Sequence, residues 1–379
     1  MSVVIGRFMK ICHVTSVHPA KDVRIFHREC ISLLNAGYIV FEIAPNVEDE
    51  VYRGISIYGV KVSKNKWKRS FLGRKAVYRK CLELNADIYH FHDPELIPVG
   101  IKLKKKNNKG VVFDSHEDVP AQILMKEWIP SFLRKPISKI YALYEQHVLR
   151  YYDALVSVTP SITARLCVLN RNVYQLTNYP LLDRSIAADN RMWGDSVCFA
   201  GGVTDQWLHQ NIIKAIADCK NIKYCLAGNA NPSYIEYLKT LEGWSEVDFV
   251  GKISFDDVPE FLSKSTAAMV LNDYVPNVGY KLGTLGNNKL FEAMQMGIPV
   301  ICTDFILWKE IIEEWKCGIC VNPHDIEAIS DAIKYLIKNK DVAKEMGDNG
   351  RKAVMEKYNW KTQEKTLLEM YKGLEEKRR

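Results

Sequence analysis

The stretch GTLGNNKLFEAMQMGIPVI, residues 283–301, decides the fold. Its small and polar start predicts a loop that leads into a helix, and Gly297-Ile298-Pro299 predicts a turn before an apolar strand. Unpaired backbone N–H groups at a helix N-terminus lie at the positive end of the helix dipole and suit a phosphate or diphosphate. Glu292 is expected two turns into the helix, where it can bind a hydroxyl-rich group such as a ribose. The stretch therefore predicts a nucleotide site; the alternative is an ordinary crossover whose Glu292 faces water.

Short apolar segments alternate with longer amphipathic segments along almost the whole chain. Strands are expected at residues 10–15, 40–45, 88–91, 111–114, 154–158, 197–200, 224–227, 247–249, 267–271, 300–303 and 318–321. Such alternation gives parallel sheets with helices on both faces. We therefore expect two doubly wound, Rossmann-like α/β domains at 1–183 and 184–360, with a helix at 361–379 packing back on the first domain. Because ligands bind beyond the carboxyl ends of parallel strands, the chemistry is expected in a cleft between two facing domains.

Composition favours a globular protein and excludes a membrane-spanning one. The 379 residues are 47% hydrophobic and 26% charged, and no run approaches the roughly 18 apolar residues that span a bilayer. No signal peptide is evident at residues 1–9, so a cytoplasmic protein is expected. Most of the ten cysteines lie in apolar strand-like runs, and the pair Cys317 and Cys320 is interpreted as structural because no second pair lies nearby.

The net charge of +7 is unevenly distributed. Basic residues are interleaved with aromatic and aliphatic ones at 61–80 and 128–150, both in the first half of the chain. This pattern suits an anionic membrane surface, so the first domain could lie peripherally at the inner face of the cell membrane. A plain solvated basic face is the alternative. Nucleic acid is not expected, because these residues form no recognisable binding module.

Polar residues follow several of the expected strands. The loop at 16–24 is not a Gly-x-Gly-x-x-Gly motif, which argues against an oxidoreductase, and Asp22 in it either binds a ligand or caps the next helix. His90-Phe91-His92-Asp93 has a zinc-like His-x-His spacing, but no third ligand is obvious, so a polar strand end is favoured. His116 beside Glu117 is expected to contact a polar ligand.

Three stretches together resemble the GT-B glycosyltransferases, and in particular glycosyltransferase family 4. They are HPAKDVRIFH at 18–27, DIYHFHD at 87–93, and NKLFEAM at 288–294 with GIPV at 297–300. The resemblance covers nearly the whole chain. It implies a hexosyltransferase that moves a sugar from a nucleotide-sugar to a saccharide or lipid-linked acceptor with retention of configuration, without a required metal or other cofactor.

The resemblance also implies roles for individual residues. Glu292 would hold the donor ribose and His116 would contact the transferred sugar, while Glu117 could serve a double-displacement route. The remaining donor-side positions are Gly201, Gly202, Gly251, Lys252, Thr284, Leu285, Gly286, Asn287 and Lys289. The acceptor-side positions are His18, Asp22, Arg24, His92 and Asp93.

The chain departs from the family pattern at two places. Thr284 stands where the family often has a first acidic residue. Gln206, Trp207, His209 and Gln210 stand where an Arg and a Lys often neutralise the diphosphate. Because the leaving diphosphate develops negative charge, Lys289 is expected to supply the missing cation. The rival functions are a nucleotide-sugar epimerase of the same architecture and a two-lobed nucleotide-sugar-binding protein without activity.

Overall fold

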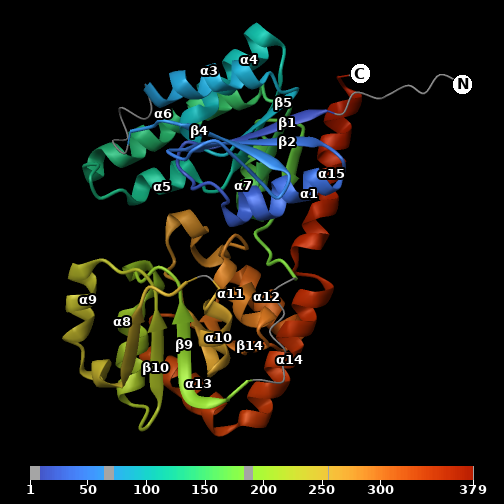
Figure 1. The fold of residues 1–379 in the computed structure, drawn as a ribbon. Coiled ribbons are helices and arrows are strands. Elements are labelled where there is room, and N and C mark those ends of the chain that lie inside the picture. The colour runs from blue at the N-terminus through green and yellow to red at the C-terminus, as the bar shows by residue number, and fades with distance from the viewer. Residues whose placement is uncertain (1–8, 64–71, 183–190, 255, 379) are drawn as a thin grey trace, which may run out of the picture. The chain divides into compact units, whose positions relative to one another are not determined.

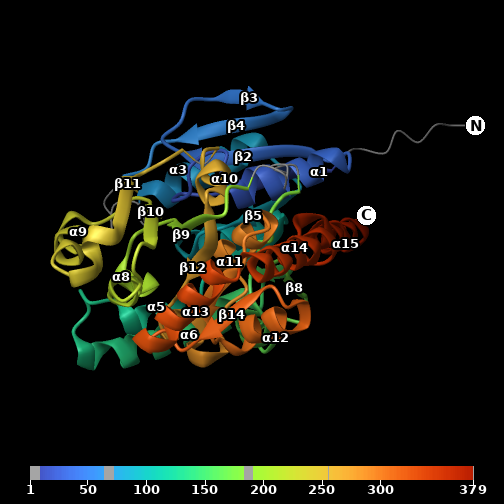
Figure 2. The same cartoon turned by 90° about the horizontal axis from the view of Figure 1, so that it is seen from below.

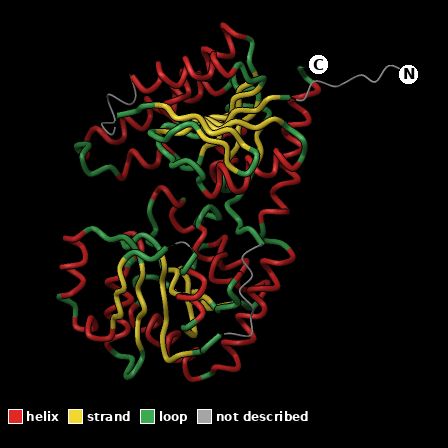
Figure 3. Tube along the Cα trace, in the orientation of Figure 1, coloured by secondary structure: helices red, strands yellow, loops and turns green. Residues whose placement is uncertain are grey.

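The computed structural model describes residues 9–63, 72–182, 191–254 and 256–378, and the chain divides into two α/β domains (Figure 1). The first consists of Met1–Asn178 with Trp360–Arg379, and the second of Tyr179–Asn359. The boundary expected between residues 183 and 184 lies outside the described residues. Each sheet lies between helices (Figure 3), as predicted from the alternation of segments.

The first domain is built on an eight-stranded sheet of order β3-β4-β2-β1-β5-β6-β7-β8. Every pairing is parallel except that of β3 with β4 at the edge visible in Figure 2. The strands are β1 Lys10–Val14, β2 Ile39–Pro45, β3 Glu50–Tyr52, β4 Ile55–Val60, β5 Ile88–Phe91, β6 Gly110–Ser115, β7 Ala154–Ser157 and β8 Val173–Gln175. The helices are η1 Val23–Cys30 (a π-helix), α1 Ile31–Asn35, α3 Arg74–Leu84, η3 Pro94–Leu96, α4 Ile97–Asn107, α5 Val119–Met125, α6 Ser131–Leu149, α7 Pro160–Cys167 and α15 Trp360–Glu376.

Helix α15 is part of the first domain although it follows the second in sequence. Its Trp360 Nε1 donates to Ser32 Oγ at 2.9 Å, and its Gln363 Oε1 accepts from the backbone N of Thr177 at 2.9 Å. Further along, the Tyr371 hydroxyl lies 2.9 Å from His90 Nδ1. The helix thus contacts α1, the end of β8 and the central strand β5.

The second domain has a six-stranded, wholly parallel sheet of order β11-β10-β9-β12-β13-β14. The strands are β9 Gly194–Ala200, β10 Lys223–Ala227, β11 Val247–Gly251, β12 Ser265–Val270, β13 Val300–Thr303 and β14 Gly318–Val321. The helices are η5 Asp205–Trp207, α8 His209–Ala217, α9 Pro232–Lys239, η6 Glu242–Glu246, α10 Val258–Ser263, η7 Pro276–Val278, η8 Tyr280–Leu282, α11 Asn288–Gln295, α12 Ile306–Trp315, α13 Ile326–Lys338 and α14 Lys340–Glu356. In chain order this is the 3-2-1-4-5-6 arrangement of a doubly wound dinucleotide-type fold.

The core of the second domain has one apolar layer on each face of the sheet. Along β9, Cys198 and Ala200 pack into the layer that contains Phe305 and Trp308, whereas Val197 and Phe199 pack into the other. This alternation follows from the two-residue period of a strand. All ten cysteines are free thiols.

Candidate active site

In the second domain, the strand order reverses between β9 and β12, where ligands of doubly wound sheets bind. A small recess lies there. Its lining comes from β9, α10, β12 and α11 and includes Ala200, Val270, Lys289, Glu292 and Ala293. Helix α11, which contains the motif NKLFEAM, therefore forms one wall of the recess at the expected position.

The turn after β9 consists of Gly201 and Gly202, so backbone without side chains borders this recess. A Cβ added to Gly201 would lie 2.9 Å from Lys289 Cε, so the glycine makes room for the lysine side chain. Gly202 is exposed, and nothing lies within 4 Å of a Cβ placed on it. After β11, Gly251 has φ +70° and its carbonyl accepts from Gly228 N at 2.7 Å, while the Lys252 side chain is exposed.

The loop before α11 is organised by its own hydrogen bonds. Thr284 Oγ1 accepts from Gly286 N at 3.0 Å, and Asn287 Oδ1 caps the helix by accepting from Lys289 N at 2.9 Å. The Thr284 carbonyl accepts from Trp308 Nε1 at 2.7 Å, and Leu285 packs partly buried on the adjoining core. These hydrogen bonds and the packing of Leu285 therefore fix the conformation of the loop.

Glu292 is placed differently from the sequence expectation. Because α11 begins at Asn288, Glu292 lies one turn into the helix rather than two. Its Oε2 accepts from Lys289 Nζ at 2.8 Å, and the two side chains are 19% and 26% exposed. The carboxylate expected to be unpaired is thus oriented by the lysine expected to supply the cation, and both reach solvent at the recess.

None of the side chains that replace the family's Arg and Lys supplies a positive charge. Trp207 packs against Phe199, and Gln210 Oε1 accepts from the Tyr234 hydroxyl at 2.6 Å. His209 is buried with its Nδ1 2.8 Å from the Tyr224 hydroxyl, and burial lowers its pKa to about 3. His209 is therefore neutral at physiological pH, which leaves Lys289 as the cation of the recess lining.

In the first domain, polar side chains gather at the carboxyl ends of β1, β5 and β6. Asp93 Oδ2 accepts from Ser16 N at 2.6 Å and from Thr15 Oγ1 at 2.8 Å, and its Oδ1 lies 3.6 Å from His18 Nε2. Asp93 thereby fixes the loop that follows β1. Only His18 of this set reaches solvent, with 31% of its side chain exposed.

Asp22 caps the π-helix η1. Its Oδ1 accepts from Arg24 N at 2.8 Å and from Ile25 N at 3.1 Å. Burial raises the pKa of Asp22, but the bond from Ile25 N, the charge of His18 and the bond from Arg24 N outweigh burial, so the pKa lies below its ordinary value. The capping alternative thus describes this residue.

Arg24 is a buried structural cation rather than an exposed acceptor contact. Its Nε and Nη2 donate to the two oxygens of Asp114 at 2.8 and 3.1 Å, and its Nη1 donates to the Leu176 carbonyl at 2.8 Å and to Asn178 Oδ1 at 2.6 Å. Burial raises the pKa of Asp114, but the Arg24 charge outweighs it and holds this pKa well below its usual range. The neighbouring His92 and His116 both contact the Asp114 carboxylate.

His116 connects this buried anion to the surface. Its Nε2 lies 3.1 Å from Asp114 Oδ2 and 3.1 Å from His92 Nδ1, and 17% of its side chain is exposed. His92 is buried behind His116, and burial lowers its pKa to about 4. Glu117 is exposed, and its backbone carbonyl accepts from Ser115 Oγ at 3.0 Å.

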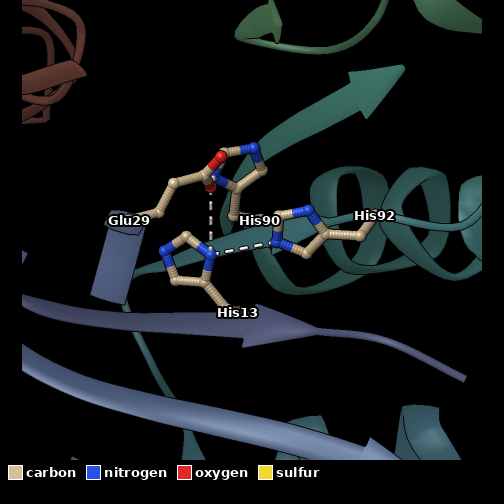
Figure 4. A group of neighbouring side chains, drawn as sticks. All are labelled: His13, Glu29, His90 and His92. Atoms are coloured by element: carbon tan, nitrogen blue, oxygen red, sulfur yellow. Dashed lines mark hydrogen bonds and ion pairs between the residues drawn. The ribbon is translucent and has the colours of Figure 1, made fainter. Parts of the chain in front are cut away.

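A buried cluster of His13, Glu29, His90 and His92 lies next to these residues (Figure 4). His13 on β1 is in register with His90 on β5, and His90 and His92 point to the same face because side chains repeat every second residue along a strand. No third ligand was obvious from the sequence, whereas the structure brings His13 and Glu29 to His90 and His92. The missed signal was His13, a lone polar residue inside an apolar strand.

Family models match both domains. A model described as Glycosyltransferase Family 4 matches residues 23–172, and one described as Glycosyl transferases group 1 matches residues 195–353. The chain belongs to the GT-B glycosyltransferases of these families, as the sequence resemblance predicted.

Curated relatives match part of the chain. The uncharacterized glycosyltransferase MJ1069 of Methanocaldococcus jannaschii is 27% identical over 184 residues, which are 47% of this chain and 45% of the relative. Sucrose-phosphate synthase 4 of Arabidopsis thaliana is 25% identical over 169 residues, 39% of this chain and 15% of the relative. The chain thus spans less than half the length of these relatives.

Solved structures match nearly the whole fold. Sucrose-phosphate synthase from Thermosynechococcus elongatus has a TM-score of 0.75 at 17% identity and covers 97% of this chain and 99% of its own. WaaG, a glycosyltransferase involved in lipopolysaccharide biosynthesis, has a TM-score of 0.69 at 16% identity, with coverage of 94% and 98%. Anabaena HepE in complex with UDP-glucose has a TM-score of 0.68 at 12% identity, with coverage of 96% and 100%. These likenesses establish the fold.

Proposed function

We propose that this chain is a retaining hexosyltransferase, which moves a sugar from a nucleotide-diphosphate sugar to a saccharide or lipid-linked saccharide during assembly of a surface polysaccharide or glycoconjugate. The observation that carries the proposal is the Lys289–Glu292 pair at the glycine turn, at the strand-order reversal of the second sheet. The titles of structural neighbours support the substrate class, since HepE was solved with UDP-glucose and TarM with UDP.

On the donor side, Glu292 would accept hydrogen bonds from the ribose while Lys289 faces the diphosphate. The ammonium donates to Glu292 in this structure and has further N–H bonds for a phosphate oxygen. Backbone N–H groups around Gly202 and the loop at 284–287 would complete the anion site. As the family resemblance implies, no divalent ion on the diphosphate is part of the proposal.

On the acceptor side, transfer would take place by front-face attack. The bond from the anomeric carbon to the diphosphate breaks, the bond to the acceptor oxygen forms on the same face, and the leaving diphosphate takes the acceptor proton. His116 would contact the transferred sugar near the reacting carbon, positioned by Asp114. The exposed Glu117 would be the nucleophile of a double-displacement alternative.

Donor binding tests the proposal through Lys289. Thermal shift against a panel of nucleoside diphosphates and nucleotide-sugars should show stabilisation with one base, about 2.7 kcal/mol at a hundredfold excess over Kd. Lys289→Met should weaken binding roughly ten- to hundredfold, because a hydrogen bond to a charged group contributes about 1.5–3 kcal/mol. Lys264→Met is the matched control, since Lys264, at the end of helix α10, pairs with Glu260 of that helix at 2.8 Å but does not line the recess.

The outcomes separate the proposal from its rivals. No shift with any nucleotide in a folded sample would contradict it. Conversion of a nucleotide-sugar without an acceptor would identify an epimerase. Binding without turnover, across a broad panel of saccharide acceptors, would identify a binding protein.

His116→Ala is expected to lower kcat roughly hundredfold or more, because losing one positioned hydrogen-bond donor at a developing charge has an effect of this size. The donor Kd should change by less than about threefold, since the transferred sugar contributes only part of donor binding. The measurement is steady-state kinetics together with donor titration. His147→Ala, at an exposed histidine on α6, should match the wild type. Unchanged turnover in the His116 variant would remove this residue from the site.

We further propose that α6 brings the first domain to an anionic membrane. Only Glu145 and Leu149 of this helix are buried. Large apolar side chains on and just before it are strongly exposed: Trp128 at 68%, Phe132 at 76%, Ile140 at 66% and Leu143 at 57%. Lys135 and Lys139 are exposed among them, so the helix combines apolar and basic groups as interfacial helices do. Of the other basic stretch, residues 64–71 lie outside the described residues.

Vesicle flotation tests this surface. The wild type should float with vesicles of anionic phospholipid and much less with zwitterionic ones, and added salt should weaken binding. Phe132→Ser with Ile140→Ser should abolish flotation, because each removes a large apolar side chain from the bilayer boundary. Val168→Ser with Met355→Ser removes exposed apolar residues elsewhere, at 80% and 49% exposure, and should leave it unchanged. Absence of binding at low salt would contradict the proposal. None of the helices that the structure describes has the length and apolar content needed to cross a bilayer.

A further inference from the structure

Four metal-ligating side chains meet in the interior of the first domain and take no part in the transfer proposed above. His13 comes from β1, Glu29 from η1, His90 from β5 and His92 from just beyond it. None is more than 2% exposed. Figure 4 shows the His13 and His92 nitrogens facing each other, with the Glu29 carboxylate turned toward His13.

The distances fit a tetrahedral metal ion. His13 Nδ1 lies 3.0 Å from His92 Nε2 and 3.6 Å from Glu29 Oε2, which lies 3.7 Å from His90 Nδ1. One ligand atom from each residue falls within 4.8 Å of the others. Zinc bonds of about 2.0–2.2 Å place neighbouring tetrahedral ligands roughly 3.3–3.5 Å apart. The first of these distances is shorter than that range and the other two are longer. Small movements of the side chains would therefore place all four ligand atoms at bonding distance from one ion.

The Glu29 carboxylate lacks the partners that a buried anion needs. Neither of its oxygens accepts a hydrogen bond from the described residues. Arg24 Nε lies 3.2 Å from Oε1 but donates to Asp114, while Oε2 faces the nitrogens of His13 and His90. Isolated buried carboxylates are costly, and coordination to a metal is one of the few ways they are stabilised. The single guanidinium of Arg24 faces both Glu29 and Asp114.

The histidine rings of the cluster also have contacts on their other nitrogens. Metal-bound histidines are usually oriented by such contacts. His92 Nδ1 lies 3.5 Å from Asp114 Oδ2, so this nitrogen can carry the proton and leave Nε2 to the metal. His13 Nε2 lies 3.5 Å from the Tyr371 hydroxyl and can donate to it. That hydroxyl is also 2.9 Å from His90 Nδ1, and because the metal would use the same side of this nitrogen, the hydroxyl oxygen must move away when the ion binds.

We propose that His13, Glu29, His90 and His92 bind one Zn²⁺ ion. Three imidazoles and a carboxylate suit zinc and its first-row neighbours rather than magnesium or calcium. Because the protein supplies all four ligands, the ion is structural and carries out no step of the transfer. It joins β1 and β5 to η1, which carries Arg24 and is capped by Asp22.

Metal analysis of tag-free protein tests the proposal. After desalting, the wild type should hold one zinc per chain, and the metal-free protein reconstituted with Co²⁺ should show the intense visible absorption of a tetrahedral site. Glu29→Gln and His90→Gln should each weaken Co²⁺ binding at least hundredfold. His209→Gln is the matched control, because His209 is equally buried and bonded to a tyrosine hydroxyl but belongs to no such cluster of described residues.

Two results would overturn the proposal. One is a folded wild type that contains no stoichiometric zinc and gives no Co²⁺ absorption. The other is metal content in His90→Gln and Glu29→Gln equal to that of the wild type, which would place the ion elsewhere. Circular dichroism verifies folding, and the wild-type measurement decides the question if both variants fail to fold.

Discussion

Replacing Arg24 with Met is expected to destabilise the first domain by about 3–5 kcal/mol, the cost of leaving a buried ion pair without one partner. Arg24 is 4% exposed, and its guanidinium binds Asp114 with two nitrogens while the third donates to Leu176 and Asn178. Without it, the buried Asp114 loses the cation that binds both of its carboxylate oxygens. Calorimetric unfolding should show the transition of the first domain at markedly lower temperature.

Two controls define this effect. Lys21→Met removes another cation of the same domain, but its pair with Glu50 is 35% and 40% exposed, so the change should stay within about 0.5 kcal/mol. Arg24→Met with Asp114→Asn should cost less than the two single changes added together, because the pair is coupled. Equal melting shifts for Arg24→Met and Lys21→Met would contradict the expectation.

The pH range of the Arg24–Asp114 pair follows from the direction of the Asp114 shift. Its pKa is depressed in the folded state, so the stabilisation is complete above the ordinary carboxyl value of about 3.9 and is lost only as pH falls toward the lower folded value. The contribution of this pair should therefore be constant between about pH 6 and 8.

Replacing Trp308 with Ala is expected to destabilise the second domain by about 3–5 kcal/mol and also to weaken donor binding. Trp308 is fully buried, meets Phe305 edge to face at 4.8 Å between ring centroids, and donates from Nε1 to the Thr284 carbonyl. Phe305 in turn packs against Gly283, whose φ of +80° starts the donor loop. The substitution removes both the filling of the core and the bond that holds the loop.

A comparison of three variants separates packing from loop positioning. Trp308→Phe keeps most of the buried ring, loses the bond to Thr284, and should weaken donor binding while costing less stability than Trp308→Ala. Leu336→Ala creates a cavity in the opposite layer of the same domain, costing about 2–5 kcal/mol, and should leave donor affinity unchanged. Isothermal titration and calorimetry measure the two quantities. Identical donor affinity in all three variants would contradict the role given to Trp308.

The parallel strands were predictable because both faces of each sheet are covered, so the strands form short apolar runs. The hairpin of β3 and β4 was not predicted. Val51 is 73% exposed, so β3 lacks the buried pattern, and the turn depends on Arg53 and Gly54 at φ +50° and +85°. Strand β8 has three residues, too few for a pattern.

Side-chain partners were less predictable than positions along the chain. The sequence placed Lys289 and Glu292 on one helix but not their mutual bond, because the start of α11 depends on the Asn287 cap. Arg24 and Asp114 are 90 residues apart, and their pairing exists only once the sheet has formed. The cluster of His13, Glu29, His90 and His92 likewise depends on the register of β1 with β5.

The return of α15 to the first domain has a consequence for synthesis on the ribosome. Residues 179–359 emerge before Trp360, so the second domain can fold while the first still lacks the helix that holds Ser32, Thr177 and His90. Domains that are continuous in sequence usually fold in the order of their translation. Here the first domain can complete its folding only after the whole second domain has been translated. A nascent chain arrested shortly before residue 360 should present a protease-resistant second domain and a protease-sensitive first one.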